Sequence, residues 1–295
     1  MEGSLRGKVC VVTGATSGIG RATAEALSAM GAELGIVCRD LERGEALRAE
    51  LVSKPGAAPV RLFEADLAVQ SQVRRAAAEI LAAYPRIHVL LNNAGVVQLK
   101  YTETSDGIET VFAVNHLAYF LLTTLLLDRL KESAPARIVN VASDAHKFVK
   151  GISFDDLGHR ASYSWTRVYG QSKLANILFT RELAHRLEGT GVTVNALHPG
   201  AVATGLGKNN GAWSRVLIGL LKPFFRTPEN GAATSIHLAS SPAVDGVSGR
   251  YFAKCREAKT TPAARDDQVA RRLWEVSERL TGLEPAGATA TSGAA

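Results

Sequence analysis

Short apolar runs alternate with longer amphipathic stretches along most of the chain. The apolar runs are rich in β-branched side chains, which favour strands, whereas the longer stretches repeat their apolar residues at helical spacing. We predict strands at residues 8–13, 34–38, 60–65, 89–91, 137–142 and 192–197, and helices at residues 19–30, 41–53, 69–83, 108–131 and 168–187. This alternation predicts an α/β fold, a doubly wound parallel sheet of about seven strands with helices on both faces.

No linker or repeat interrupts this pattern, so we expect one domain over residues 1–283. Residues 284–295 carry almost no apolar bulk and are expected to form a disordered tail. The segment 205–227 begins with glycines and continues with apolar side chains at helical spacing from Trp213 to Phe225. We expect it to be a mobile lid over an apolar substrate, and an ordinary core-facing helix is the alternative.

Composition and charge exclude several classes of protein. Hydrophobic residues make up 46% and charged residues 21% of the chain, as in soluble globular proteins. The net charge is +6, but no run of five like charges occurs, so we do not expect nucleic-acid binding. The longest nearly apolar stretch, residues 117–127, is shorter than the ~20 residues that span a bilayer. The first strand begins by Lys8, so no leader is expected.

The three cysteines and seven histidines do not form a recognisable metal or nucleophile motif. Cys10, Cys38 and Cys255 make no CxxC pair, and their odd number points to a reducing, cytoplasmic compartment. No HExxH or GxSxG pattern is present, so the sequence favours neither a metal site nor a serine hydrolase.

A glycine-rich segment, Thr13–Gly20, joins the first predicted strand to the first helix. Gly14 permits a tight turn, Gly18 lets the backbone approach a phosphate, and Gly20 lets the helix pack on the sheet. The N–H groups and the dipole at the start of the helix then hold a pyrophosphate. The segment predicts a Rossmann-type dinucleotide site, and a glycine turn without a ligand is the alternative.

The choice between the two nicotinamide cofactors depends on the end of the second strand. A site selective for NAD places a carboxylate there, which accepts a hydrogen bond from the ribose 2′-OH. Here Cys38 supplies no carboxylate, and Arg39 can bind a 2′-phosphate with its forked guanidinium. We therefore expect NADP(H) in preference to NAD. A solvated Arg39, or an Asp40 that turns inward, is the alternative.

Tyr169 and Lys173 lie four residues apart on a predicted helix and project from one face of it. At 4 Å and an effective dielectric of 20, a lysine charge stabilises a phenolate by about 4 kcal/mol. That energy would bring a tyrosine pKa near the range of a general acid–base. The YxxxK spacing is common by chance. However, the rest of this helix is apolar, so a lysine that points inward from it indicates a functional role.

Two further polar residues lie in apolar surroundings. Asn115 interrupts a long apolar helix, although asparagine is a poor helix former, and a satisfied core asparagine is the alternative. Ser143 follows the strand at residues 137–142, where its hydroxyl would donate to a substrate oxygen beside Tyr169. The alternative for Ser143 is a turn cap.

In combination, these motifs resemble the short-chain dehydrogenase/reductase superfamily over about residues 8–283. The motifs are Thr13–Gly20, Asn92–Gly95, Asn115, Ser143, Tyr169–Lys173 and Pro199-Gly200. A closer resemblance is to the retinol dehydrogenase-like branch. It rests on Cys38–Asp40, Leu91–Gly95, Arg137–Val141, Gln171–Asn176, His198–Gly200, Tyr251-Phe252 and Arg271–Trp274.

The resemblance implies an enzyme that moves a hydride between NADP(H) and an apolar alcohol or carbonyl compound, such as retinol, retinal or another lipophilic aldehyde or ketone. It implies that Tyr169 exchanges a proton with the substrate oxygen, which Ser143 holds. Lys173 would bind the nicotinamide ribose, and Asn115 would hold a relay water. The implied cofactor contacts are Gly14, Ser17, Gly18, Ile19, Gly20, Arg39, Asp66, Leu67, Asn93, Ala94, Gly95, Tyr169, Lys173, Pro199 and Thr204.

The sequence departs from its resemblance in three places. Ala142 stands where the branch usually has a second serine, and the Ser143–Tyr169 spacing of 26 indicates an insert that shapes the substrate pocket. The N-terminal membrane segment of many eukaryotic members has no counterpart. We expect a cytoplasmic monomer or homodimer that touches a membrane surface at most peripherally. The alternative function is a non-catalytic NADP-binding sensor or scaffold, which has no need of all four catalytic residues.

Overall fold

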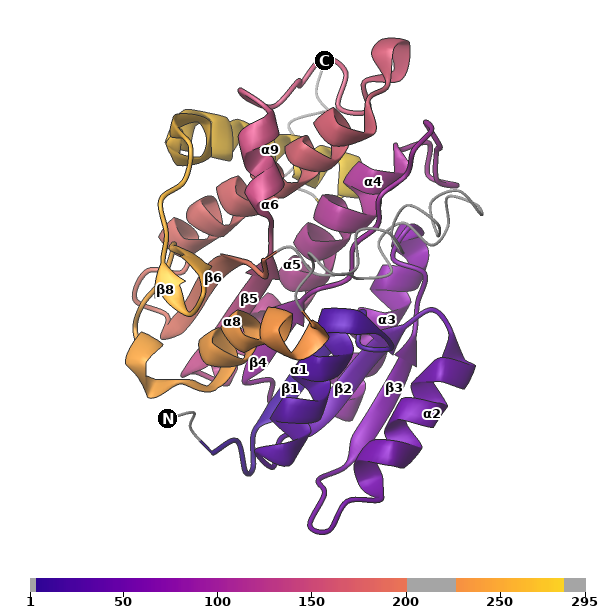
Figure 1. Ribbon diagram of the computed structural model, residues 1–295, viewed down its shortest axis with the longest axis vertical. Helices are drawn as coiled ribbons and strands as arrows, with labels where there is room; N and C mark the ends of the chain where they lie inside the picture. The colour runs from indigo at the N-terminus through magenta and orange to yellow at the C-terminus, as the bar shows by residue number, and fades with distance from the viewer. Residues whose placement is uncertain (1–3, 201–226, 284–295) are drawn as a thin grey trace, which may run out of the picture.

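The computed structural model describes residues 4–200 and 227–283, which form a sheet flanked by helices (Figure 1). The sheet has eight strands in the order β3-β2-β1-β4-β5-β6-β7-β8. The strands are β1 (Val9–Thr13), β2 (Glu33–Cys38), β3 (Val60–Glu64), β4 (Val89–Asn92), β5 (Ala136–Val141), β6 (Val192–His198), β7 (Tyr251–Ala253) and β8 (Arg256–Glu257). The predicted doubly wound α/β fold is confirmed.

The one strand beyond the expected seven is β8, which pairs antiparallel with β7, whereas the other neighbouring strands are parallel. The two strands are joined by Lys254 and Cys255, both of which have positive φ angles. Two such residues in succession make a tight hairpin, usually with Asn or Gly in these places. The hairpin was not predicted because this signal is missing.

Helices cover both faces of the sheet (Figure 1). They are α1 (Gly18–Ala29), α2 (Leu41–Val52), α3 (Gln70–Ala83), α4 (Thr110–Phe112), α5 (Ala118–Glu132), α6 (Trp165–Arg186), α8 (Pro228–Ser240) and α9 (Asp267–Thr281). Helices α1, α2 and α8 contact one face, helices α3, α5 and α6 contact the other, and α9 packs on α6. Strand order reverses between β1 and β4, which is where ligands of such sheets bind.

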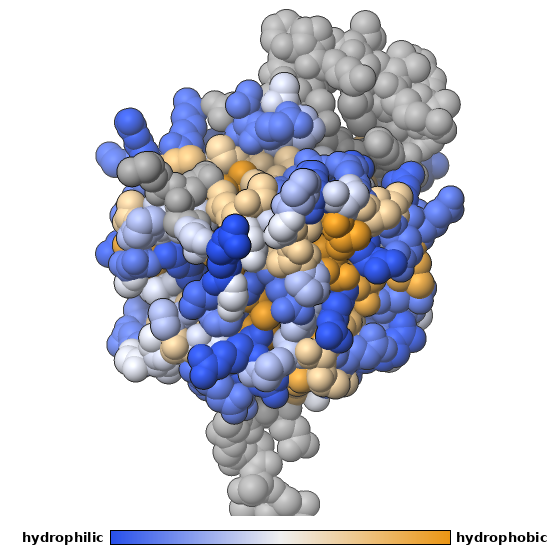
Figure 2. Space-filling view, turned by 90° about the horizontal axis from the view of Figure 1, so that it is seen from below, coloured by the Kyte–Doolittle hydropathy of each residue, from blue (hydrophilic) through white to orange (hydrophobic). Residues whose placement is uncertain are grey.

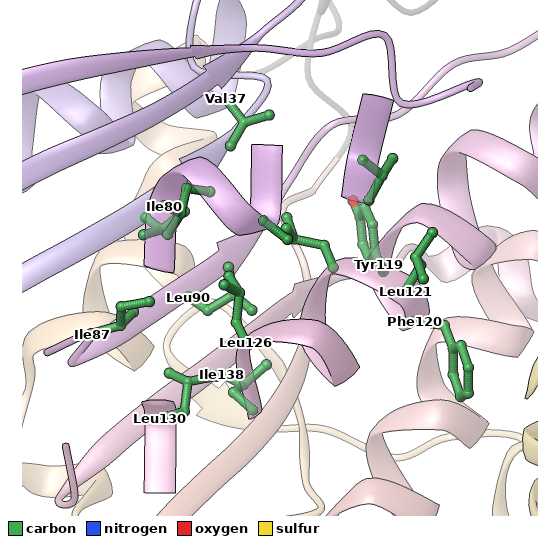
Figure 3. Packing of buried hydrophobic residues seen from close by; sticks show 14 of the residues in the cluster. Val37, Ile80, Ile87, Leu90, Tyr119, Phe120, Leu121, Leu126, Leu130 and Ile138 are labelled. Atoms are coloured by element: carbon green, nitrogen blue, oxygen red, sulfur yellow. The ribbon is translucent and has the colours of Figure 1, made fainter. Parts of the chain in front are cut away.

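The sheet has a hydrophobic core on each face, and alternate residues of a strand point into one core or the other. On β1, Val9 and Val11 face the α3–α5–α6 side, whereas Cys10 and Val12 face the other side. Leu90 and Ile138 extend the first core beneath the aromatic and aliphatic side chains of α5 (Figure 3). This period of two is what a parallel sheet covered on both faces requires, so the short apolar runs of the sequence were reliable signals.

The predicted helix at residues 108–131 is interrupted. A π-helical turn, Ala113–Leu117, separates α4 from α5, and Asn115 lies at its centre. By length and composition alone, the span Thr110–Glu132 is long and apolar enough to cross a membrane, and it extends beyond the stretch 117–127 that the sequence singled out. However, 78% of its most apolar window is buried inside the fold, as in the core helix of a globular protein.

The molecular surface opposite the carboxyl ends of the strands is chemically mixed. Hydrophilic residues cover most of the face in Figure 2, and hydrophobic residues interrupt them in smaller groups.

The predicted lid lies outside the described residues except for Thr227, whose side chain caps the start of α8. The predicted tail at 284–295 also lies outside them.

Candidate active site

A cleft of about 540 Å³ opens where the carboxyl ends of β1, β2, β4, β5 and β6 meet. Its walls include nearly all of the site residues that the sequence predicted within the described ranges. They are Gly14, Ser17, Gly18, Ile19, Gly20, Arg39, Asp66, Leu67, Asn93, Ala94, Gly95, Ser143, Tyr169, Lys173 and Pro199. Asn115 lies directly behind this wall, and Thr204 is outside the described residues.

The glycine turn is shaped for close backbone contact. Gly14 has a φ of 67°, and a Cβ on Gly20 would lie only 2.2 Å from the Gly14 carbonyl oxygen. Ser17 begins α1 without a side-chain cap, so the first-turn N–H groups receive no capping hydrogen bond from it. Such donors at a helix N-terminus suit a phosphate, and these residues therefore fit the pyrophosphate of a dinucleotide.

Thr13 and Asn93 lock the glycine turn to the end of β4. The Thr13 hydroxyl accepts hydrogen bonds from the N–H groups of Asn93 at 2.9 Å and Ala94 at 3.1 Å. In return, the Asn93 side chain donates to the carbonyl oxygens of Thr13 and Gly14. Sequence reasoning missed this role of Thr13. Its only signal was a hydroxyl at the end of an otherwise apolar strand.

The end of β2 presents positive charge to the cleft. Asp40 lines the cleft as well, and its carboxylate caps α2 by accepting from the Arg43 N–H at 3.1 Å and lies 3.3 Å from Arg43 Nε. Arg39 lines the cleft, and its guanidinium lies 3.5 Å from the Asp66 carboxylate. Arg43 also lines the cleft and was not predicted. The two arginines fit a 2′-phosphate, and the Asp40 and Asp66 carboxylates beside them are each engaged with one of these arginines.

Asn115 is fully engaged by the protein. Its Oδ1 accepts from the Val96 N–H at 2.8 Å, and its Nδ2 donates to the Val96 carbonyl at 3.0 Å and to Ser172 Oγ at 3.1 Å. The alternative of a satisfied core asparagine therefore describes its side chain. The π turn around it is a backbone irregularity of the kind that recurs at functional sites. Its role toward a relay water stays a prediction.

The structure shows the turn-cap alternative for Ser143, and the predicted role of its hydroxyl toward a substrate oxygen stays a prediction. Its hydroxyl accepts from the Ala145 N–H at 3.2 Å, which caps the short 3-10 helix Asp144–Phe148. Ser143 and Tyr169 line the same cleft, where an interaction with the Ser143 hydroxyl lowers the pKa of the Tyr169 phenol. A cap interaction holds Ser143 in place while its hydroxyl faces the phenol, so the two predicted roles are compatible.

Lys173 is buried behind Tyr169. Its Nζ donates to the Val141 carbonyl at 2.9 Å and lies 5.6 Å from the centre of the Tyr169 ring. Gly95 is close to both Lys173 and Asn115: a Cβ there would lie 3.6 Å from Lys173 Nζ and 3.4 Å from Asn115 Oδ1. The fold thus brings the four predicted catalytic residues to one place from three separate segments.

The predicted effect of Lys173 on Tyr169 is wrong for this structure. Burial raises the pKa of the Tyr169 phenol to about 12, and the hydrogen bond from Ser143 opposes that rise. Burial also lowers the pKa of Lys173 to about 7, which removes part of the charge that would have stabilised a phenolate. The prediction assumed an intermediate effective dielectric around the two side chains and did not include the cost of removing either group from water.

Several known proteins are similar to this chain over most of its length. A family model described as short chain dehydrogenase matches residues 8–215. Retinol dehydrogenase 14 of Mus musculus is 50% identical over 294 residues, covering 95% of this chain and 88% of the mouse protein. An uncharacterized protein from Mycobacterium Paratuberculosis has a crystal structure with a TM-score of 0.76 and 34% identity, covering 95% of this chain and 96% of that chain. A short chain dehydrogenase from Burkholderia cenocepacia in complex with NADP has a TM-score of 0.68 and 26% identity, covering 84% of this chain and 96% of that chain.

Proposed function

The chain belongs to the short-chain dehydrogenase family, and we propose that it is an NADP(H)-dependent oxidoreductase for apolar alcohols and carbonyl compounds. Action on a CH–OH group follows from its retinol dehydrogenase relatives, whereas the cofactor and the apolar substrate are our proposal. The observation that carries the proposal is one cleft that holds Ser143, Tyr169 and Lys173 beside a glycine turn shaped for a pyrophosphate, with Lys173 Nζ 5.6 Å from the centre of the Tyr169 ring.

The bound nicotinamide supplies or accepts the hydride, and the protein handles the proton and the substrate oxygen. Burial keeps the Tyr169 phenol protonated at neutral pH, which is the form that gives a proton to a carbonyl oxygen during reduction. Ser143 would hold the same oxygen by a hydrogen bond. Lys173, just behind the phenol, would hold the nicotinamide ribose.

Preference for NADP(H) rests on the two arginines at the end of β2. Arg39 and Arg43 both line the cleft, and Asp40 is occupied as the cap of α2. The NADP-bound relative from Burkholderia cenocepacia supports this choice. A forked, charge-assisted contact with a phosphate contributes about 1.5–3 kcal/mol, which is one to two decades in affinity.

Arg39→Ala should remove most of the preference for NADPH and leave NADH binding nearly unchanged, because only NADPH carries the 2′-phosphate. We would titrate both cofactors into the parent and the variant and compare dissociation constants. Arg48→Ala is the matched control, since Arg48 is an exposed arginine of α2 that pairs with Glu45 and is not among the residues lining the cleft. Equal affinity of the parent for NADH and NADPH would contradict the assignment.

An apolar substrate is supported by the other end of the cleft. Val96, Val114 and Ala142 line it beside the catalytic pair. Leu99, Phe148 and Trp165 are large hydrophobic residues exposed to solvent, in or next to the loops that carry this wall. The retinol dehydrogenase relatives support a retinol- or retinal-like compound, and other lipophilic aldehydes or ketones share the required chemistry.

The proposed function is tested by a panel of carbonyl compounds with NADPH, followed by the loss of NADPH absorbance. We expect kcat/KM to be higher for retinal or another long apolar aldehyde than for a short polar aldehyde. If the parent bound NADPH but reduced no member of the panel, and oxidised no matching alcohol with NADP⁺, the sensor or scaffold alternative would be favoured. A polar preference would contradict the substrate class alone.

We also propose a cytoplasmic monomer or homodimer built as one domain over residues 1–283, with at most peripheral membrane contact. Burial raises the pKa of the Cys10 thiol to about 12 and that of Cys38 to about 11. Such protonated, buried thiols act as small core side chains and do not need an oxidising compartment. Size-exclusion chromatography with light scattering measures the oligomeric state.

A further inference from the structure

The 3-10 helix that carries Ser143 is anchored by residues that the proposed reaction does not use. We call this element, Asp144–Phe148 with its cap Ser143, the serine turn. Its backbone N–H at Asp144 donates to His198 Nδ1 at 3.2 Å, at the end of β6. Its Asp144 carboxylate accepts from the Tyr251 hydroxyl at 3.2 Å, on β7. Three neighbouring strands, β5, β6 and β7, therefore hold the serine turn together.

The hydrogen bonds fix the orientation of two imidazole rings. His198 Nδ1 accepts from an amide, so its proton is on Nε2, which lies 3.8 Å from the Asp144 carboxylate. His146 Nδ1 lies 2.7 Å from the Ser143 carbonyl, which can only accept, so His146 carries its proton on Nδ1. The ring of His146 also packs edge-on against Tyr251 at 5.3 Å between centroids. Tyr251 thus contacts the serine turn at two points.

The serine turn has little room to adjust on its other side. A Cβ on Gly170 would lie 2.8 Å from the Ala145 carbonyl oxygen, so the turn rests directly on the backbone next to Tyr169. The Ser143 hydroxyl faces Tyr169 while it caps the turn through the Ala145 N–H. Any movement of the turn therefore changes the distance between the Ser143 and Tyr169 hydroxyls.

We propose that His198 and Tyr251 are positioning residues, which set the position of the Ser143 hydroxyl relative to Tyr169 by holding the serine turn through Asp144. Neither is among the residues that line the cleft, so they act through Ser143 and not on the reacting atoms. The inference rests on the proposed function. It also gives a role to Tyr251, which the sequence marked without assigning it one, and gives His198, which the resemblance places over the nicotinamide, a second role.

Tyr251→Phe is the first test, because it removes one hydroxyl and keeps the ring that packs on His146. We expect kcat/KM for an apolar aldehyde to fall about tenfold. This loss is smaller than the ~100-fold loss of rate that a 1 Å misplacement of the reacting groups can cause. The dissociation constant of NADPH should stay within about twofold. Tyr84→Phe is the matched control, since Tyr84 is also a buried tyrosine whose hydroxyl donates to a backbone carbonyl, far from the cleft.

The pH profile separates positioning from simple structural support. The Ser143 hydrogen bond lowers the pKa of Tyr169, so a loosened serine turn should move the basic limb of alcohol oxidation to higher pH. A residue that only supports the sheet edge would lower the melting temperature without moving that limb. An unchanged pH profile and an unchanged kcat/KM in Tyr251→Phe would overturn the proposal.

A pair of His198 variants covers the case in which one variant fails to fold. Asn places an acceptor where His Nδ1 lies, so His198→Asn should recover most of the activity that His198→Leu loses. Equal loss in both variants, with equal NADPH affinity, would also overturn the proposal. A parent that turns over no substrate refutes the proposed function instead, so the two failures are distinguishable.

Discussion

Tyr169→Phe is expected to fold and to bind NADPH like the parent but to lose about 10² to 10⁴ in turnover. Phenylalanine fills the same volume and keeps the ring beside Lys173, so only the proton donor is removed. The remaining rate would come from hydride transfer within an otherwise complete site. We would measure single-turnover reduction of an apolar aldehyde and, separately, the dissociation constant of NADPH.

The same Tyr84→Phe variant controls for loss of a buried hydroxyl, and it should reduce the aldehyde at the parent rate. If purified Tyr169→Phe reduced the aldehyde at near the parent rate, Tyr169 would not be the proton donor. A variant that lost NADPH binding as well would show that the hydroxyl holds the cofactor, which the present assignment does not require.

The sheet could be predicted from sequence because its strands are buried on both faces. The run at residues 34–38 is a continuous apolar segment and the run at 192–197 is mostly apolar, and the observed strands β2 and β6 differ from them by one residue at an end. The last part of the chain was left unassigned, although start and stop signals were present. Asp266 caps α9, and Gly282 ends it with a positive φ. The helix was not predicted because its residues are rich in arginine and only weakly apolar, and the start and stop signals alone do not identify a helix.

The candidate site was predicted residue by residue, but the roles of several side chains were not. The sequence left Asp40 able to face the ribose, and only the structure shows its carboxylate as the cap of α2. Asn115 could be singled out from the sequence because it is a polar residue in an apolar helix. The π turn around it could not be predicted, because no sequence pattern indicates such a turn. Tertiary contacts decide such features, because the competing conformations differ by single hydrogen bonds.

The pKa of Tyr169 is a second property that the sequence could not predict, because it depends on how deeply the residue is buried. Spacing alone predicted that Lys173 would lie close to the phenol, and it does, at 5.6 Å from the ring centre. Burial, which no spacing reveals, raises the pKa of the tyrosine and lowers that of the lysine. Desolvation therefore disfavours the charged form of both groups, and this effect cannot be read from the YxxxK spacing.

Lys173→Met should abolish turnover and at the same time stabilise the cofactor-free protein. Lys173 is almost fully buried, and the Val141 carbonyl is its one hydrogen-bond acceptor among the described residues. Its pKa falls from 10.5 to about 7, so the folded state disfavours the proton that the unfolded chain keeps. Methionine fills a similar volume without that penalty, which is on the order of a few kcal/mol at neutral pH.

The sign of the pH dependence makes the Lys173→Met prediction specific. Below pH 7 the lysine is charged in both states, so its full destabilisation is present, and between pH 7 and 10.5 that destabilisation is relieved. The melting temperature of Lys173→Met should therefore exceed that of the parent by at least about 4 °C at pH 6.5, and the gap should narrow toward pH 10. Lys131→Met, at an exposed lysine that pairs with Asp128, should show no such gap. A Lys173→Met protein that melts below the parent at pH 6.5 would mean that the lysine is stabilised in its charged form, and that Tyr169 faces a full positive charge after all.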